Sequence, residues 1–155
     1  MLDATDNRSA RDHRSKAMTA AAGGTDVYFS ADVETDGPIP GPFSMLSFGL
    51  VRCGKFDGAK FEPEDLSVGF YRELQPISKK YQNEALMVNG LDRDKLIREG
   101  AEPGRAMNEA HEWIMQNSHG LNPVLVAYPL SFDWTWLFWY FTEFCKSGSP
   151  FNYSR

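Results

Sequence analysis

Apolar and polar residues alternate between residues 27 and 36, and this alternation predicts a β-strand with two unlike faces. One face would carry the apolar residues Val27, Phe29, Ala31 and Val33, and the other would carry Tyr28, Ser30, Asp32 and Glu34. The two carboxylates, Asp32 and Glu34, would therefore point the same way. The competing interpretation is a half-buried strand whose polar face simply meets water.

Two more strands are expected in the first half of the chain. Residues 45–51 form a mostly apolar run, and Leu66, Val68 and Phe70 alternate with smaller or polar residues in a segment that ends at Pro76. Residues 37–42 contain three prolines and two glycines, which predicts a rigid exposed loop, and residues 53–58 have turn composition. The connections are too short for helical crossovers, so we expect an antiparallel meander.

The following segment has a helical pattern. Ser78 would cap a short helix through about Met87, and Asp92 would cap a second helix that ends at Gly100. A third helix would run from Pro103 to Gly120 and present one face made of Ala106, Ala110, Trp113, Ile114 and Asn117.

The chain then returns to the sheet and ends in an aromatic helix. Residues 123–127 predict a short buried strand, and a helix is expected from Asp133 to about Cys145. Its apolar stripe would comprise Trp134, Leu137, Phe138, Phe141 and Phe144. Three more aromatic residues, Trp136, Trp139 and Tyr140, lie off that stripe, so this helix should be covered on both sides.

The order β-β-β, helices, β, helix predicts a mixed α/β domain. Its last strand would lie beside the first, which would place Asp133 at the carboxyl end of the sheet near Asp32 and Glu34. Three carboxylates at one place make a cation site, and their hard oxygen ligands suit Mg²⁺ or Mn²⁺. The competing interpretation makes Asp133 only the N-cap of the last helix.

Composition narrows the class of protein. The 155 residues are 42% hydrophobic and 24% charged, which is typical of one globular domain. We expect a disordered leader over residues 1–24 and the domain over residues 25–155.

No apolar run is long enough to span a membrane and no signal-type start is present, which favours a cytoplasmic protein. The two cysteines predict reduced thiols. The net charge of −5 disfavours non-specific binding to duplex nucleic acid, which needs many phosphate contacts. It is compatible with an enzyme that binds the end of a strand through metal ions.

Three segments together resemble the DEDD (DnaQ-like) 3'-5' exonuclease superfamily. They are Ser-Ala-Asp-Val-Glu-Thr at residues 30–35, Met-Leu-Ser-Phe-Gly-Leu-Val at residues 45–51, and Leu-Val-Ala-Tyr-Pro-Leu-Ser-Phe-Asp at residues 125–133. They look like the first two motifs of this group, which includes ribonuclease T and the proofreading subunit of bacterial DNA polymerase III. The resemblance runs from about Val27 to the end and implies a ribonuclease H-like fold, with a mixed sheet and flanking helices.

The resemblance also implies an activity and its residues. It implies hydrolysis of phosphodiester bonds at the 3' ends of single-stranded DNA or RNA by a two-metal mechanism that uses Mg²⁺ or Mn²⁺. Asp32, Glu34 and Asp133 would be the catalytic and metal-binding residues, and Thr35 and Phe132 would contact the terminal nucleotide. A packed core phenylalanine is the competing interpretation of Phe132. The choice between DNA and RNA and the presence of a homodimer are left open.

The sequence departs from the family pattern in several places. The family has a third motif, a His or Tyr four residues before a final Asp, and no such pair follows Asp133. Tyr128-Pro129 stands where the family commonly has His-Asn, and Asn89 stands where it often has His before Gly90.

The missing third motif leads to two hypotheses. Because no general base is identified, we expect the chain as given to be poorly active, with C-terminal truncation as the simplest explanation and a missing helix as the cover for Trp136, Trp139 and Tyr140. The alternative is a catalytically inactive ribonuclease H-like module that binds nucleic acid or a protein partner. A paired-carboxylate glycosidase is disfavoured, because its two acids stand on opposite sides of a sugar.

Overall fold

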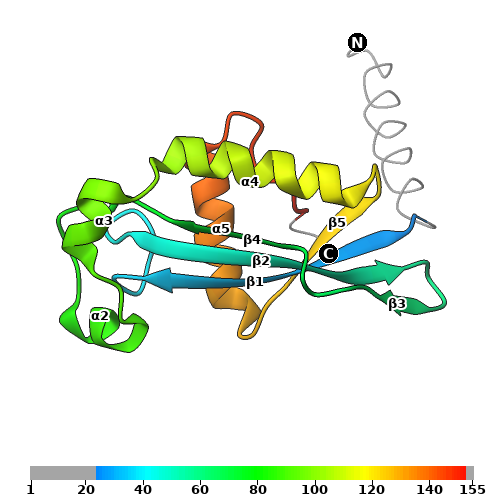
Figure 1. Ribbon diagram of the computed structural model, residues 1–155, viewed down its shortest axis with the longest axis horizontal. Coiled ribbons are helices and arrows are strands. Elements are labelled where there is room, and N and C mark those ends of the chain that lie inside the picture. The colour runs from blue at the N-terminus through cyan, green and yellow to red at the C-terminus, as the bar shows by residue number, and fades with distance from the viewer. Residues whose placement is uncertain (1–23, 153–155) are drawn as a thin grey trace, which may run out of the picture.

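The computed structural model describes residues 24–152, in which a mixed sheet carries two long helices on one face (Figure 1). The leader expected over residues 1–24 lies outside the described residues except for Gly24. The elements in chain order are β1 (Asp26–Thr35), β2 (Met45–Phe56), β3 (Phe61–Pro63), β4 (Gly69–Glu73), α2 (Asn83–Asn89), α3 (Arg93–Glu99), α4 (Pro103–Ser118), β5 (Asn122–Val126) and α5 (Leu130–Phe144). No helix of this described part is both long and apolar enough to cross a bilayer.

The strands are ordered β3-β2-β1-β5, and β4 also pairs with β2. β1 and β4 both run antiparallel to β2, which confirms the predicted meander. β5 runs parallel to β1, with Ser30 opposite Val126, so the strand after the helical segment lies beside the first strand as predicted. The carboxyl end of β1 therefore extends past the end of β5, toward the start of α5.

The two faces of β1 differ as the alternation predicted. Its apolar residues Val27, Phe29, Ala31 and Val33 are all buried. They pack with the buried faces of α4 and α5 in one core, to which Ala106, Ile114, Leu137 and Phe141 contribute. Burying one face of β1 under two helices fixes the register of the strand, because a shift by one residue would turn this face to solvent. Asp32 and Ser30 consequently lie on the exposed face of the sheet.

Several predicted boundaries are confirmed. Asp92 caps α3 by accepting a hydrogen bond from the backbone N–H of Lys95 at 2.9 Å, and α3 ends at Gly100. Pro103 begins α4, which ends where His119 adopts a left-handed conformation just before Gly120. Cys53 and Cys145 are both free, as predicted.

The turn predicted over residues 53–58 begins only after Phe56, because β2 continues to that residue and forms a hairpin with β3. Gly54 is not a turn glycine. A Cβ atom at Gly54 would lie 2.3 Å from the carbonyl oxygen of Glu62, so this glycine permits two strands to approach closely. The third strand is also shorter than predicted: it begins at Gly69, and Leu66 and Val68 are 64% and 39% exposed before it.

The predicted start of the first helix is wrong as well. α2 begins at Asn83, and Ser78 belongs to the turn before it. The Ser78 hydroxyl donates to the carbonyl oxygen of Pro42 at 2.7 Å and accepts from the backbone N–H of Lys80 at 2.9 Å. These bonds use the hydroxyl to join two loops, so it does not cap a helix.

The buried face of α5 differs from the predicted stripe. The buried residues are Asp133, Trp136, Leu137, Tyr140 and Phe141. The structure therefore contradicts the expectation of an uncovered patch at Trp136, Trp139 and Tyr140: the first and last of these are fully buried, and Trp139 is half-buried. A helix that is apolar all round gives no sequence signal for which side meets the sheet.

Candidate active site

Asp32 and Glu34 lie near the end of β1, with side chains on the same face of the sheet. Asp32 is exposed and Glu34 is half-buried. Val33 lies between them, beyond Ser30 and Val126, which form the last β1–β5 pair. The backbone N–H of Val33 therefore makes no hydrogen bond to β5. This break in the ladder is where a third carboxylate attaches.

Asp133 is fixed to that free amide. Its Oδ1 atom accepts a hydrogen bond from the Val33 N–H at 3.0 Å, across 100 residues of sequence, and its side chain is only 3% exposed. The helix N-cap is Pro129, and Asp133 lies in the first turn of α5, so the interpretation of Asp133 as an N-cap is wrong. The Asp133 carboxylate therefore bonds to β1 between Asp32 and Glu34 and does not cap its own helix. This bond brings three acidic side chains to one end of the sheet.

The electrostatics of these residues show that their charges interact. Burial raises the pKa of Glu34, and the negative charges of Asp32 and Asp133 raise it further. Burial also raises the pKa of Asp133; the Val33 hydrogen bond opposes this change, and the charge of Asp32 adds to it. The charge of Asp32 therefore acts on both Glu34 and Asp133 and destabilises their ionised forms.

The donor set suits a hard divalent cation, although the side chains are not closed around one point. In the described part of the chain, no three His, Cys, Asp or Glu side chains lie close enough together to hold a metal ion as they stand. Repulsion between the negative charges keeps the carboxylates apart, and the hydrogen bond from Val33 holds the Asp133 carboxylate against β1. A cation would relieve the repulsion, and Asp32, Glu34 and Asp133 are the residues that would hold it.

A pocket of about 400 Å³ has Glu34 of the acidic group in its lining, and we call it the β1-end pocket. The end of β1 and the following loop form one side, through residues that include Glu34, Thr35 and Pro38. α2 forms the opposite side through Glu84, Ala85 and Val88, and Phe132 of α5 lines it as well.

Both residues expected to contact a nucleotide line this pocket. Thr35 is buried, and its hydroxyl donates to the carbonyl oxygen of Gly37 at 2.9 Å. Phe132 is 37% exposed, so the interpretation of Phe132 as a packed core residue is wrong.

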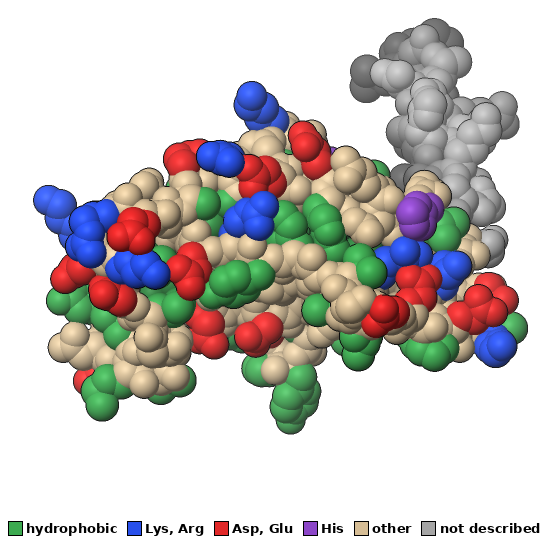
Figure 2. Space-filling view, viewed as in Figure 1, with side chains coloured by type: hydrophobic (Ala, Val, Ile, Leu, Met, Phe, Trp, Pro, Cys, Tyr) green, Lys and Arg blue, Asp and Glu red, His purple; other side chains and the backbone are tan. Residues whose placement is uncertain are grey.

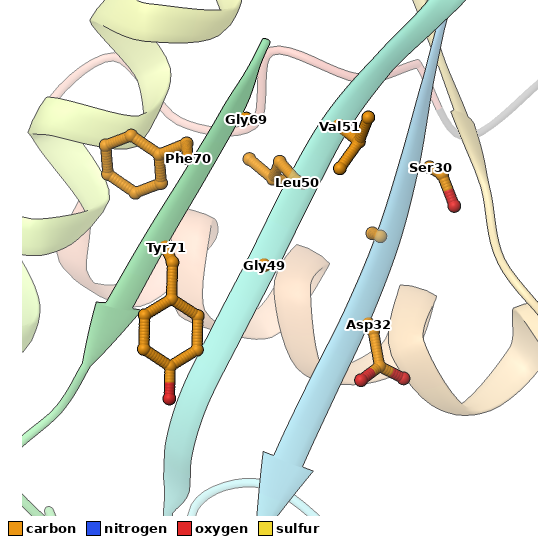
Figure 3. Close-up of a pocket in the computed structure, with 9 residues that line it drawn as sticks. Ser30, Asp32, Gly49, Leu50, Val51, Gly69, Phe70 and Tyr71 are labelled. Carbon is orange, nitrogen blue, oxygen red and sulfur yellow. The ribbon is translucent and has the colours of Figure 1, made fainter. Parts of the chain in front are cut away.

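A second pocket of about 380 Å³ lies on the exposed face of the sheet (Figure 3). It has a floor of small residues, Gly49 and Gly69, with Asp32 at one side and Tyr71 at the other. Tyr71 is 53% exposed. Asp32 therefore borders the exposed face of the sheet as well as the end of β1.

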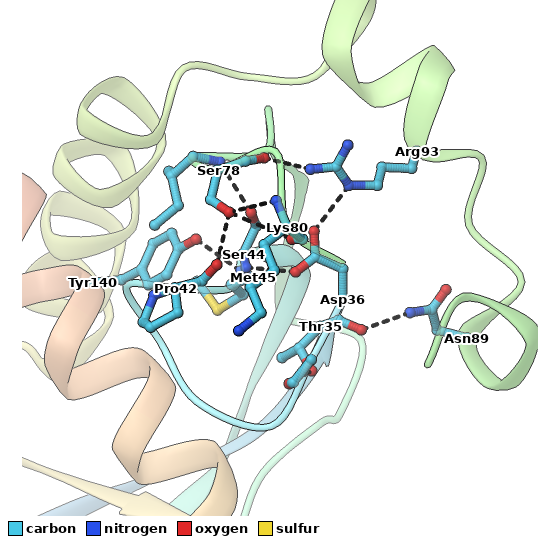
Figure 4. A network of polar contacts seen from close by, with 12 residues as sticks. Thr35, Asp36, Pro42, Ser44, Met45, Ser78, Lys80, Asn89, Arg93 and Tyr140 are labelled. Atoms are coloured by element: carbon cyan, nitrogen blue, oxygen red, sulfur yellow. Dashed lines mark hydrogen bonds and ion pairs between the residues drawn. The ribbon is translucent and has the colours of Figure 1, made fainter. Parts of the chain in front are cut away.

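A polar network joins the end of β1 to the loops and helices that follow it in the chain (Figure 4). Its centre is Asp36, whose Oδ1 atom accepts from the Ser44 N–H at 2.6 Å and whose Oδ2 atom accepts from Arg93 Nε at 3.0 Å. The Asn89 side chain donates to the carbonyl oxygen of Thr35 at 3.0 Å. The Asp36–Arg93 pair has no signal in the sequence, because the two residues are 57 positions apart and no spacing rule connects them.

Charged side chains of both signs are mixed on the surface that Figure 2 shows. Lys and Arg gather over α3 and near β3, with Asp and Glu between them, so this face has no continuous basic stripe. A nucleic-acid ligand would therefore need contacts other than a broad basic surface.

Comparison with known proteins gives a relative and a fold. No family model matches the chain. The chain is 40% identical over 130 residues to the 3'-5' DNA exonuclease Cap18 of Escherichia coli, an alignment that covers 82% of this chain and 63% of that protein. The chain is therefore similar in sequence to a 3'-5' DNA exonuclease. It spans less than two thirds of the length of the curated relative that it matches.

The fold is similar to that of part of exonuclease I. An E. coli exonuclease I structure in complex with a 5cy-dA13 oligonucleotide matches with a TM-score of 0.59 at 16% identity, over 75% of this chain and 24% of that chain. A product-bound exonuclease I structure matches with a TM-score of 0.56 at 15% identity, over 75% of this chain and 25% of that one. These likenesses confirm the predicted ribonuclease H-like fold class, and the 40% identity confirms the resemblance seen in the sequence.

Proposed function

We propose that the chain is the carboxylate-bearing part of a metal-dependent 3'-5' exonuclease that hydrolyses single-stranded DNA. One observation carries the proposal: the Asp133 side chain of α5 is bonded to the Val33 amide, between Asp32 and Glu34. Support for the substrate comes from the name of the relative, a 3'-5' DNA exonuclease, and from oligonucleotide complexes of exonuclease I, including one with dT13.

The proposed chemistry follows from the donor set. Two bound Mg²⁺ or Mn²⁺ ions would lower the pKa of an attacking water and neutralise the charge that develops on the phosphoryl group. Asp32, Glu34 and Asp133 would hold these ions. Burial and neighbouring negative charge raise the pKa values of Glu34 and Asp133, so a nearby cation would stabilise the ionised forms of both.

The β1-end pocket would hold the terminal nucleotide of the strand. Phe132 offers an exposed aromatic face for stacking on a base, and aromatic stacking works with any base. Glu34 lies in both the pocket lining and the acidic group, so a nucleotide in the pocket would place its 5'-side phosphate near the carboxylates. This arrangement would release mononucleotides from a 3' end.

The proposal is tested with a 5'-labelled single-stranded DNA oligonucleotide and the chain in molar excess. We expect a ladder of products shortened from the 3' end with Mn²⁺ or Mg²⁺, none with EDTA, and none with Asp32→Asn. A matched RNA oligonucleotide tests the choice of substrate. If wild-type protein binds the strand and leaves it intact at long times in both metals, the inactive binding module is the correct function instead.

A further inference from the structure

The α2 wall of the β1-end pocket has no fully buried side chain, and only Ala85, Leu86 and Asn89 are half-buried. α2 has seven residues, none of which is buried, and its N-cap residue Gln82 makes no side-chain capping bond. Met87 and Val88, the large apolar residues at its end, are 84% and 87% exposed. Isolated helices of this length are unstable in water, so contacts outside α2 must hold it in place.

Those contacts are polar and converge on the residues that follow Glu34. The backbone N–H of Gln82 donates to the carbonyl oxygen of Asp36 at 2.8 Å, which fixes the start of α2. Asn89 donates to the carbonyl oxygen of Thr35 at 3.0 Å, which fixes its end. The last residue of β1, Thr35, and the residue after it, Asp36, thus hold the two ends of α2.

The Asp36–Arg93 ion pair stabilises this attachment. The Asp36 side chain is fully buried, that of Arg93 is 10% exposed, and Arg93 Nε lies 3.0 Å from Asp36 Oδ2. The same guanidinium donates to the carbonyl oxygen of Ser78 and lies over the Tyr81 ring, 4.9 Å from its centroid. One guanidinium therefore joins Asp36 to the segment that leads into α2 (Figure 4).

We propose that the Asp36–Arg93 ion pair is a positioning element that holds α2 against the β1-end pocket and so sets how tightly the terminal nucleotide of the substrate strand is held. This inference rests on the proposed function of the pocket. Neither residue lines the pocket. The ion pair would therefore change the fraction of molecules in which α2 is positioned to bind the nucleotide. It would not move the carboxylates that carry the proposed chemistry.

The test compares Arg93→Gln with Arg105→Gln in the full chain. Arg105 is a matched control, because its Nε also pairs with a carboxylate, Glu109 at 2.8 Å, but it is 77% exposed on α4 and outside the pocket. The substrate is a single-stranded DNA with 2-aminopurine at the 3' end, and a second strand carries 2-aminopurine near the 5' end. Single-turnover reactions in Mn²⁺ give the maximal rate and the half-saturating protein concentration, and the fluorescence reports the environment of each end.

If the wall is competent only about one-tenth of the time without the ion pair, the half-saturating concentration rises about tenfold while the maximal rate is nearly unchanged. The 3'-terminal fluorescence change on binding should shrink, and the 5'-proximal signal and the Arg105→Gln variant should behave as wild type. Arg93→Lys keeps the charge and should restore part of the affinity. Asn89→Ala removes an independent attachment of α2 and should raise the half-saturating concentration in the same direction, even if Arg93→Gln folds poorly.

The outcomes separate the two proposals. If wild type neither hydrolyses the strand nor changes the 3'-terminal fluorescence, the proposed function fails and the positioning role fails with it. If wild type is active and Arg93→Gln and Asn89→Ala match Arg105→Gln, only the positioning role is overturned. A fall in maximal rate with unchanged half-saturation would also overturn it, because the pair would then act on the chemistry.

Discussion

Replacing Asp133 by Asn removes one negative charge from the proposed metal site and leaves the local structure intact. The side chain is 3% exposed, and its Oδ1 atom accepts the Val33 N–H bond at 3.0 Å. The Asn side chain has the same size and also provides an acceptor oxygen, so this bond can persist. Loss of one carboxylate ligand should cost about 3 kcal/mol of transition-state stabilisation, which is roughly a hundredfold fall in the single-turnover rate.

Stability should change in the opposite direction to activity. Burial and the Asp32 charge raise the pKa of Asp133, so its ionised form is disfavoured in the folded protein at neutral pH without metal. The neutral Asn side chain avoids this penalty, and Asp133→Asn should unfold at the same temperature as wild type or higher in EDTA. Asp133→Ala instead leaves the Val33 N–H without its partner and should lose about 1–3 kcal/mol of stability.

The assay pairs rates with thermal unfolding for wild type, Asp133→Asn and Asp133→Ala. Asp92→Asn is the matched control, because it also neutralises a carboxylate that accepts a backbone N–H bond, at the start of α3. It should leave rate and stability nearly unchanged, since Asn is an equally good cap. A wild-type rate for Asp133→Asn in Mn²⁺ would contradict the proposed role of Asp133, as would a rate that falls only in proportion to a loss of folded protein.

Three further perturbations have expected outcomes. Phe132→Ala should weaken binding of single-stranded DNA by about 1–3 kcal/mol, measured by fluorescence anisotropy, without lowering stability much, because the ring is 37% exposed; unchanged affinity would remove Phe132 from the substrate contacts. Tyr140→Phe should lower the free energy of unfolding in urea by about 1–3 kcal/mol, because the Met45 N–H donates to the Tyr140 hydroxyl at 2.7 Å inside the core; a neutral effect would contradict that bond. Gly37→Ala should lower that free energy by about 1–3 kcal/mol, because its Cβ would lie 2.1 Å from the Phe43 ring, whereas Gly24→Ala meets nothing within 4 Å and should be neutral.

The parts of the fold that follow from local pattern were predictable. The alternation in β1 predicted both its buried face and the common direction of Asp32 and Glu34, because side-chain direction in a strand follows the sequence directly. The parallel placement of β5 followed from the order of the elements. Asp92 and Pro103 predicted helix starts because capping chemistry depends only on neighbouring residues.

The parts that depend on tertiary contacts were not predictable. The sequence of α5 is apolar on all sides, so it did not indicate that Trp136 and Tyr140 would be the fully buried residues. Ser78 is a good helix-capping residue, but its hydroxyl instead donates a hydrogen bond to the carbonyl oxygen of Pro42. At the site, the sequence predicted that Asp133 approaches β1. Its bond to the Val33 amide was not predictable, because it forms only where the pairing between β1 and β5 has ended.

Direct measurement of Mn²⁺ binding by electron paramagnetic resonance tests the central claim most closely, because it needs neither substrate nor turnover. We expect wild-type protein to bind Mn²⁺, and we expect Asp32→Asn, Glu34→Gln and Asp133→Asn each to weaken that binding, while Asp92→Asn does not. Wild-type affinity in the three site variants, or no Mn²⁺ binding by wild type, would contradict it.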